Sequence, residues 1–130
     1  MKNRRQFLKE SSALGAASFL APSIYAGTAA GASELEVGVL FSLSGGLAMI
    51  EKSLSDATLM AIEEINAAGG VNGMMIKPIL EDGASDPKTY NEKASKLVIR
   101  DRVPTVFGSY TSASRKAVLP VFEKRNNMYF

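Results

Sequence analysis

The sequence has 130 residues, a length typical of one domain, and it contains neither cysteine nor histidine. Disulfide bonds, thiolate catalysis, zinc sites built from Cys and His, histidine general bases and lipid anchoring through an N-terminal cysteine are therefore excluded. The formal net charge is +2, but residues 1–32 hold four of the fifteen Lys and Arg residues and one of the thirteen Asp and Glu residues. The remaining 11 basic and 12 acidic residues give −1, a near balance that predicts no nucleic-acid partner.

Residues 1–32 have the pattern of an export signal. A basic head with the pair Arg4-Arg5 precedes a weakly apolar stretch over 13–24, which is too short to span a bilayer. The head resembles the twin-arginine export motif, with Asn3 where that motif has Ser or Thr. Ala30-Gly31-Ala32 matches a cleavage site, so we expect cleavage after Ala32 and delivery to the periplasm. A general secretory signal and a disordered basic tail are the alternatives.

The first element of the folded part is a predicted strand over Glu36–Ser42. Its apolar run is continuous rather than alternating, which is typical of a strand buried on both faces by helices. A turn at 43–46 follows, and Ser53-Leu54-Ser55-Asp56 is expected to open a helix. Apolar residues then recur at helical spacing up to Ile65, and Gly69-Gly70 should end the helix.

Met75–Leu80 is predicted to form a second strand, at an edge of the sheet because Pro78 has no N–H to donate. Glu81–Pro87 is expected to be a loop. Its three carboxylates match no calcium-loop spacing, so acidic turn residues are favoured over a metal site. The second predicted helix has an apolar face and an outer, solvated face with Lys93, Lys96, Arg100 and Arg102; the apolar face consists of Tyr90, Ala94, Leu97 and Val98.

Two further strands are predicted, over Thr105–Phe107 and from Met128, with a helix between them. The alternation of strands and helices with short connections predicts an α/β fold with a doubly wound parallel sheet. Because a fourth strand without a covering helix would leave unpaired edges, we expect residues 33–130 to be part of an N-terminal lobe of a longer protein.

The segment Gly108–Lys116 is the strongest candidate site. It joins the third strand to the third helix, and the carboxyl ends of parallel strands face the crevice where ligands bind. Its hydroxyl residues Thr111, Ser112 and Ser114 could contact a small molecule or could simply cap the helix. Local spacing alone favours capping.

Two segments, Val37–Gly45 and Ala61–Gly73, resemble the type 1 periplasmic solute-binding proteins, including binders of branched-chain amino acids. A third, Gly108–Val121, is similar to the branch that binds urea and short-chain amides. The resemblance implies a two-lobed protein that closes over a small neutral amide and delivers it to the membrane permease of an ABC transporter, without a cofactor.

The same resemblance suggests which residues contact the ligand. It implies that Tyr110 and Ser112 line the pocket, with Thr111 beside them, and that the loop at Ser44-Gly45 borders the same cleft. On this basis ligand contact at Ser112 outweighs simple capping, and the two roles are compatible.

An enzyme is the least supported class. Ser112 has no histidine to activate it, and a dyad with Lys116 is only weakly suggested by the spacing. The glycines after the first strand match neither a dinucleotide nor a phosphate-binding motif. Two alternatives within the resemblance are a branched-chain amino-acid-binding protein and an amide-sensing regulator, and the export signal argues against the regulator.

Overall fold

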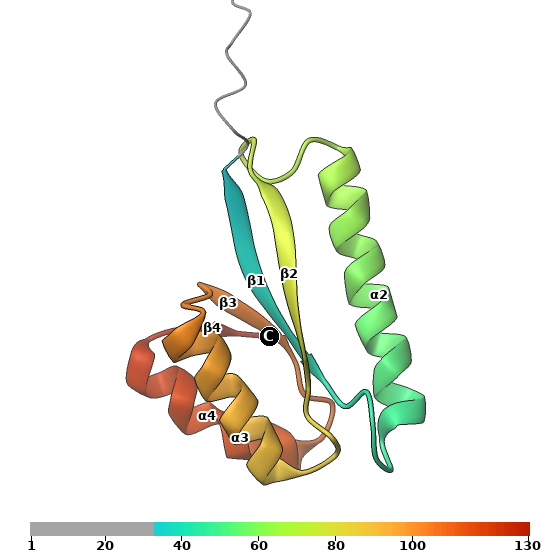
Figure 1. Cartoon of the computed structure of the whole chain (residues 1–130), viewed down its shortest axis with the longest axis vertical. Helices are drawn as coiled ribbons and strands as arrows, with labels where there is room; N and C mark the ends of the chain where they lie inside the picture. Colours follow the sequence, from blue (N-terminus) through green and yellow to red (C-terminus); the bar gives the residue numbers. More distant parts are fainter. Residues whose placement is uncertain (1–32) are drawn as a thin grey trace, which may run out of the picture. The chain divides into compact units, whose positions relative to one another are not determined.

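The computed structural model describes residues 33–130, and the predicted export signal lies outside the described residues. Strands and helices alternate along this part of the chain (Figure 1). The elements are β1 (Glu34–Phe41), α2 (Ala48–Ala67), β2 (Met75–Asp82), α3 (Pro87–Ser95), the π-helical turn η1 (Lys96–Arg100), β3 (Thr105–Gly108), α4 (Ser112–Arg125) and β4 (Met128–Tyr129). Within these residues, no helix combines the length and apolar character needed to cross a membrane.

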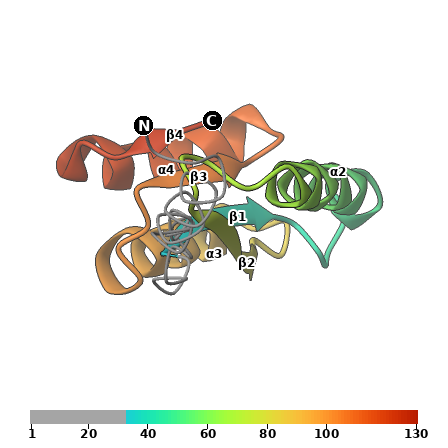
Figure 2. The same ribbon diagram turned by 90° about the horizontal axis from the view of Figure 1, so that it is seen from above.

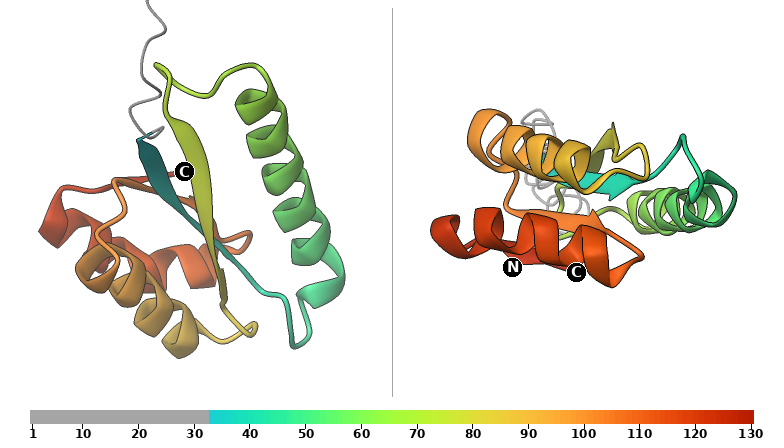
Figure 3. Two further views of the ribbon diagram at one scale, coloured as in Figure 1. Left: turned by 45° about the horizontal axis from the view of Figure 1, so that its top comes forward. Right: turned by 90° about the horizontal axis from the view of Figure 1, so that it is seen from below.

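The four strands form one parallel sheet in the order β2-β1-β3-β4. Helix α2 lies on one side of this sheet, and α3 and α4 lie on the other (Figures 2 and 3). The predicted doubly wound α/β sheet is therefore confirmed. β2 pairs only with β1 and lies at an edge, which confirms the inference drawn from Pro78, whose partner in the register is Val37.

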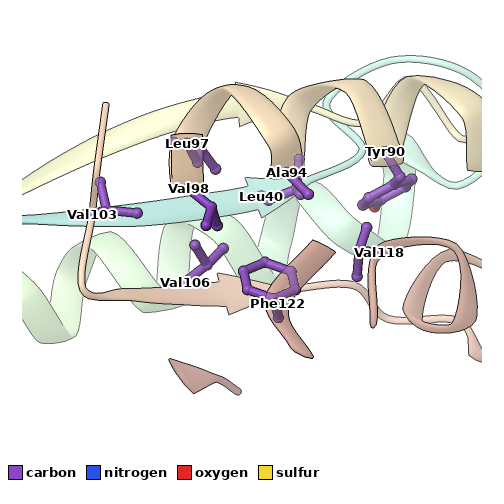
Figure 4. Close-up of a cluster of buried hydrophobic side chains, with 9 residues drawn as sticks. All are labelled: Leu40, Tyr90, Ala94, Leu97, Val98, Val103, Val106, Val118 and Phe122. Carbon is purple, nitrogen blue, oxygen red and sulfur yellow. The ribbon is translucent and has the colours of Figure 1, made fainter. Parts of the chain in front are cut away.

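Each face of β1 contributes to a separate apolar cluster. Val37, Val39 and Phe41 pack with Ile62 of α2, because alternate side chains of a strand point to the same face. Leu40 points to the other face, into a larger cluster drawn from α3, η1, β3 and α4 (Figure 4). The continuous apolar run of β1 is therefore buried on both sides, as predicted.

The start of α2 differs from the prediction. The helix begins at Ala48, so Ser53 lies inside it rather than at its N-terminus. Its N-cap residue, Leu47, provides no capping side chain. Instead, the Leu47 N–H donates to Ser85 Oγ at 3.0 Å, and Glu51 in the first turn accepts the Ser42 N–H at 2.6 Å. Partners distant in sequence fix this helix start, and a local capping pattern cannot reveal them.

The prediction was also wrong for Glu81 and Asp82, which belong to β2 rather than to a loop. Glu81 is buried and forms ion pairs with Lys93, at 2.8 Å, and with Lys96. The face of α3 and η1 that carries these lysines is thus not simply solvated. Because a buried carboxylate requires a partner, the two cations lie against the sheet instead of extending into water.

Candidate functional site

The carboxyl ends of β1 and β3 lie side by side at the point where the strand order reverses. From β1 the chain passes to β2 on one side, whereas β3 pairs on the other side. The following helices, α2 and α4, lie on opposite faces of the sheet (Figure 2). In open α/β sheets, ligands bind in the crevice outside the strand ends at such a switch point. The two predicted site segments, Ser44-Gly45 and Tyr110–Ser112, leave these two strands.

The loop between β1 and α2 is held by side chains at the end of β2 and in the loop that follows it. Asp82 accepts the Leu43 N–H at 2.8 Å and the Ser44 hydroxyl at 2.7 Å. Ser85 Oγ donates to the Ser44 carbonyl at 2.9 Å. Gly45 has φ of +81°, and a Cβ there would lie 2.7 Å from Ser85 Oγ. A glycine is therefore required where this loop approaches the loop that follows β2.

The segment between β3 and α4 begins with a second close approach. A Cβ on Gly108 would overlap the carbonyl oxygen of Leu40 on β1. The Ser109 N–H donates to that same carbonyl at 3.0 Å, so the chain leaves β3 tightly against β1. Tyr110 follows with 57% of its surface exposed at the end of the sheet.

The hydroxyls of this segment divide into two groups. Thr111 is the N-cap of α4, and its Oγ1 accepts the Ser114 N–H at 3.1 Å. Ser114 is buried, and its Oγ donates to the Thr111 carbonyl at 2.9 Å. Ser112 is the first helical residue, and its side chain is exposed. Capping therefore falls to Thr111, whereas the Ser112 side chain is exposed at the start of the helix.

A cavity of about 240 Å³ connects the segments at this edge of the sheet. It lies between the start of α2, the loop after β2 and the first turn of α4. Its lining residues are Leu47, Ser85, Pro87, Tyr90, Thr111, Ala113 and Ser114. Thr111 therefore lines a cavity, while Ser112 and Tyr110 are exposed beside it.

A buried polar cluster that was not predicted from the sequence lies beneath this edge. Glu51 of α2 accepts hydrogen bonds from the Ser42 N–H and from the Tyr90 hydroxyl. Ser42 Oγ lies 3.0 Å from the Tyr90 oxygen and accepts the Ser85 N–H at 3.0 Å. Burial, and next the hydrogen bond to Glu51, raise the pKa of the Tyr90 phenol far above its ordinary value of 10.0. A usable signal existed: helical spacing puts Glu51 on the same face as Ser55 and Ile62, which are buried.

The three carboxylates considered as metal ligands have other roles. Glu81 pairs with lysines, Asp82 binds the loop after β1, and Asp86 caps α3 by accepting the Thr89 N–H at 2.8 Å. Over residues 33–130, no group of three or more acidic residues is arranged to hold a metal ion.

The comparisons with known proteins agree with this architecture. The family described as "Periplasmic binding protein domain" matches residues 35–130. "Leu/Ile/Val-binding protein homolog 7" of Brucella abortus (strain 2308) is 32% identical over 108 residues, which cover 83% of this chain and 27% of the relative. "Leu/Ile/Val-binding protein homolog 8" of Brucella suis biovar 1 (strain 1330) is 36% identical over 118 residues, covering 90% of this chain and 28% of the relative.

A solved structure supports the same assignment. The branched-chain amino acid transporter substrate binding protein LivJ from Streptococcus pneumoniae, in complex with isoleucine, superposes with a TM-score of 0.73 at 28% identity. The match covers 75% of this chain and 28% of that protein. The chain thus spans little more than a quarter of the length of these relatives. The family match over residues 35–130, the parallel sheet and the hydroxyl-rich switch point together show that this chain belongs to the periplasmic binding protein domain family.

Proposed function

We propose that this chain forms the first lobe of an exported solute-binding protein, which captures a small molecule and presents it to the permease of an ABC importer. One observation carries the proposal: two uncharged loops meet at the switch point of the sheet. Ser44 and Gly45 come from one loop, and Tyr110 and Thr111 come from the other, with Ser112 next to them at the start of α4. They offer hydroxyls and an exposed ring, which suit a hydrogen-bonding solute and no covalent chemistry.

The periplasm is the proposed compartment. The family membership supports export, and so does the signal pattern over residues 1–32, with cleavage after Ala32 and the twin arginines Arg4-Arg5. The amide-sensing regulator is disfavoured for the same reason, since a cytoplasmic sensor needs no export signal.

A branched-chain amino acid is the proposed ligand class. The names of the Leu/Ile/Val-binding relatives and the isoleucine bound to the structural relative support it. The local chemistry is compatible, because the start of α4 presents backbone N–H groups and the Ser112 hydroxyl. A helix N-terminus favours an anionic group such as an α-carboxylate.

Urea or a short-chain amide is the second candidate. The segment Gly108–Val121 resembles that branch of the family, and the described site residues carry no charge. A neutral planar ligand would need only hydroxyls, backbone groups and an aromatic face, which Ser112 and Tyr110 supply. In either case a second lobe must close over the ligand by a hinge motion, which buries the hydrogen bonds that provide specificity.

Calorimetry on the full-length protein with its second lobe tests both candidates. Leucine, isoleucine, valine, urea and acetamide are titrated separately into the same preparation. We expect saturable binding of the branched-chain amino acids and none of urea or acetamide. Tighter binding of urea or acetamide would reverse the order of the two candidates. If none of the five compounds binds, both ligand assignments are wrong.

A further inference from the structure

The first turn of α2 places a carboxylate inside the protein. Glu51 has no exposed surface, and its Oε2 accepts hydrogen bonds from the Ser42 N–H, at 2.6 Å, and from the Tyr90 hydroxyl. Its second oxygen, Oε1, is buried without a hydrogen-bond partner among the described residues. The carboxylate thus connects three elements: α2, the end of β1 and α3.

Burying a carboxylate has a free-energy cost, so it is an inefficient way to stabilise a fold. Transfer of a charge from water to a protein interior costs several kcal/mol in real proteins, and well-packed apolar groups of similar volume are often as stabilising or more so. Among residues 33–130, the partners of Glu51 are two neutral groups that donate hydrogen bonds to Oε2. The effect of the Glu51 side chain is on geometry: it holds the backbone at Ser42 in a fixed position relative to Tyr90.

The backbone at Ser42 is the root of the loop that carries Ser44 and Gly45. Beyond Ser42 the loop is held by two residues: Asp82 accepts the N–H groups of Leu43 and Ser44 and the Ser44 hydroxyl, and Ser85 Oγ donates to the Ser44 carbonyl and accepts the Leu47 N–H. Ser85 is in turn fixed, through its own N–H, by Ser42 Oγ. The cluster of Glu51, Tyr90, Ser42 and Ser85 is therefore continuous from the interior to the candidate site.

We propose that Glu51 is a positioning residue for the ligand loop. It acts through Ser42 and Tyr90, and it sets the direction in which Ser44 and Gly45 face the switch-point crevice. Tyr90 is its partner in this role, because the Tyr90 hydroxyl contacts both Glu51 and Ser42. The inference rests on the proposed function, since loop direction affects binding only if the crevice holds a solute.

Hydrogen exchange on the full-length protein tests the positioning directly and requires no ligand. The variants are Glu51→Gln, which preserves shape, and Tyr90→Phe, which removes one hydroxyl; Glu63→Gln on the exposed side of α2 is the control. We expect the amides of Ser42–Leu47 to exchange roughly tenfold to a hundredfold faster in both test variants, as for the loss of one hydrogen bond to a charged group. The amides of Val37–Leu40 report global stability and should change less.

A merely structural role predicts a different result. Exchange would then accelerate equally in the loop and in β1, or in neither, and either outcome overturns the proposal. If Glu51→Gln does not fold, Tyr90→Phe decides alone, because it removes a single atom from the same cluster. Glu63→Gln should leave both regions as in the wild type.

Affinity for leucine or urea, whichever binds the wild type, is the second measurement. Glu51→Gln should weaken this affinity roughly tenfold, and Glu63→Gln should leave the affinity unchanged. The melting temperature of each variant is measured in parallel. Faster loop exchange with unchanged affinity would contradict the link between Glu51 and the ligand. Absence of any wild-type binding would contradict the proposed function and leave the exchange experiment to decide the positioning.

Discussion

Residues of the same type have different tasks at the end of β3. Thr111 and Ser114 satisfy the first turn of α4 and each other, with Thr111 Oγ1 and Ser114 Oγ 2.8 Å apart. Ser112, between them in sequence, has an exposed side chain. The difference arises because consecutive residues of a helix point about 100° apart, so only some of them can return to the helix end.

Substitutions at Ser112 and at Thr111 should separate ligand affinity from protein stability. In the full-length protein, Ser112→Ala should weaken ligand binding by roughly 1–3 kcal/mol, because a ligand group is left unpaired in a closed site. Its melting temperature should stay close to that of the wild type. Thr111→Ala should lower stability by about 1 kcal/mol through loss of the cap. Calorimetry and thermal melts on both variants measure the two quantities, and unchanged affinity in Ser112→Ala would show that Ser112 does not contact the ligand.

At the scale of elements, two short loops at the carboxyl edge are built around ionised carboxylates. Burial raises the pKa of Asp82, but the Ser44 hydroxyl and the N–H groups of Ala84 and Leu43 outweigh it and hold that pKa below its ordinary value of 3.8. The N–H and hydroxyl of Thr89 likewise lower the pKa of Asp86. Both carboxylates are therefore hydrogen-bonded more strongly in the folded state than in the unfolded chain.

Because these pKa values are lowered, the fold should lose stability in acid. The unfolded chain takes up protons near pH 4, whereas the folded Asp82 resists protonation. Its contribution to the free energy of unfolding is thus complete at neutral pH and is lost as the pH falls through the folded pKa. We expect the drop in melting temperature between pH 6 and pH 3 to be smaller in Asp82→Asn than in the wild type. Asp56→Asn, at an exposed position of α2, is the control, and equal drops in all three proteins would contradict the expectation.

At the scale of the molecule, one face of the sheet is incompletely covered over residues 33–130. A groove of about 710 Å³ lies between α2 and the sheet, and most of its lining is apolar, with Leu35, Phe41, Leu54, Ile65 and Phe107 among the residues. Phe130 beyond β4 is 62% exposed and stacks on Phe107, with ring centroids 5.7 Å apart. The opposite face is filled by the cluster around Leu40 and Phe122 (Figure 4).

Residues 33–130 alone should therefore be marginally stable or prone to self-association, because an open apolar groove and two sheet edges remain in contact with water. Scanning calorimetry and light scattering after size-exclusion chromatography test this on the purified segment. We expect a broad or absent transition, or elution above the monomer mass. A cooperative melt of a monomer would contradict this expectation and show that the cluster around Leu40 and Phe122 is enough to stabilise the segment.

The sequence by itself determined the order of the elements, the parallel α/β architecture and the edge position of β2. These features follow from local causes: the continuous apolar run of β1, the glycines that end α2, and a proline that cannot donate a ladder bond. Through family resemblance and strand order, the sequence also located Ser44, Gly45 and the segment from Tyr110 to Ser112 directly after strands, at the connections to the next helices.

Only the tertiary structure decided which polar groups work together. Glu51 is far in sequence from Ser85 and Tyr90. Helical spacing places Glu51 on the buried face of α2, but no local period identifies its partners or the early start of the helix. The pairing of Lys93 and Lys96 with Glu81 and the capping of α4 by Thr111 were also decided by the tertiary structure. The physical reason is that burying an unpaired polar group costs free energy. Such a group therefore pairs with whichever partner is near in space, whatever their separation along the chain.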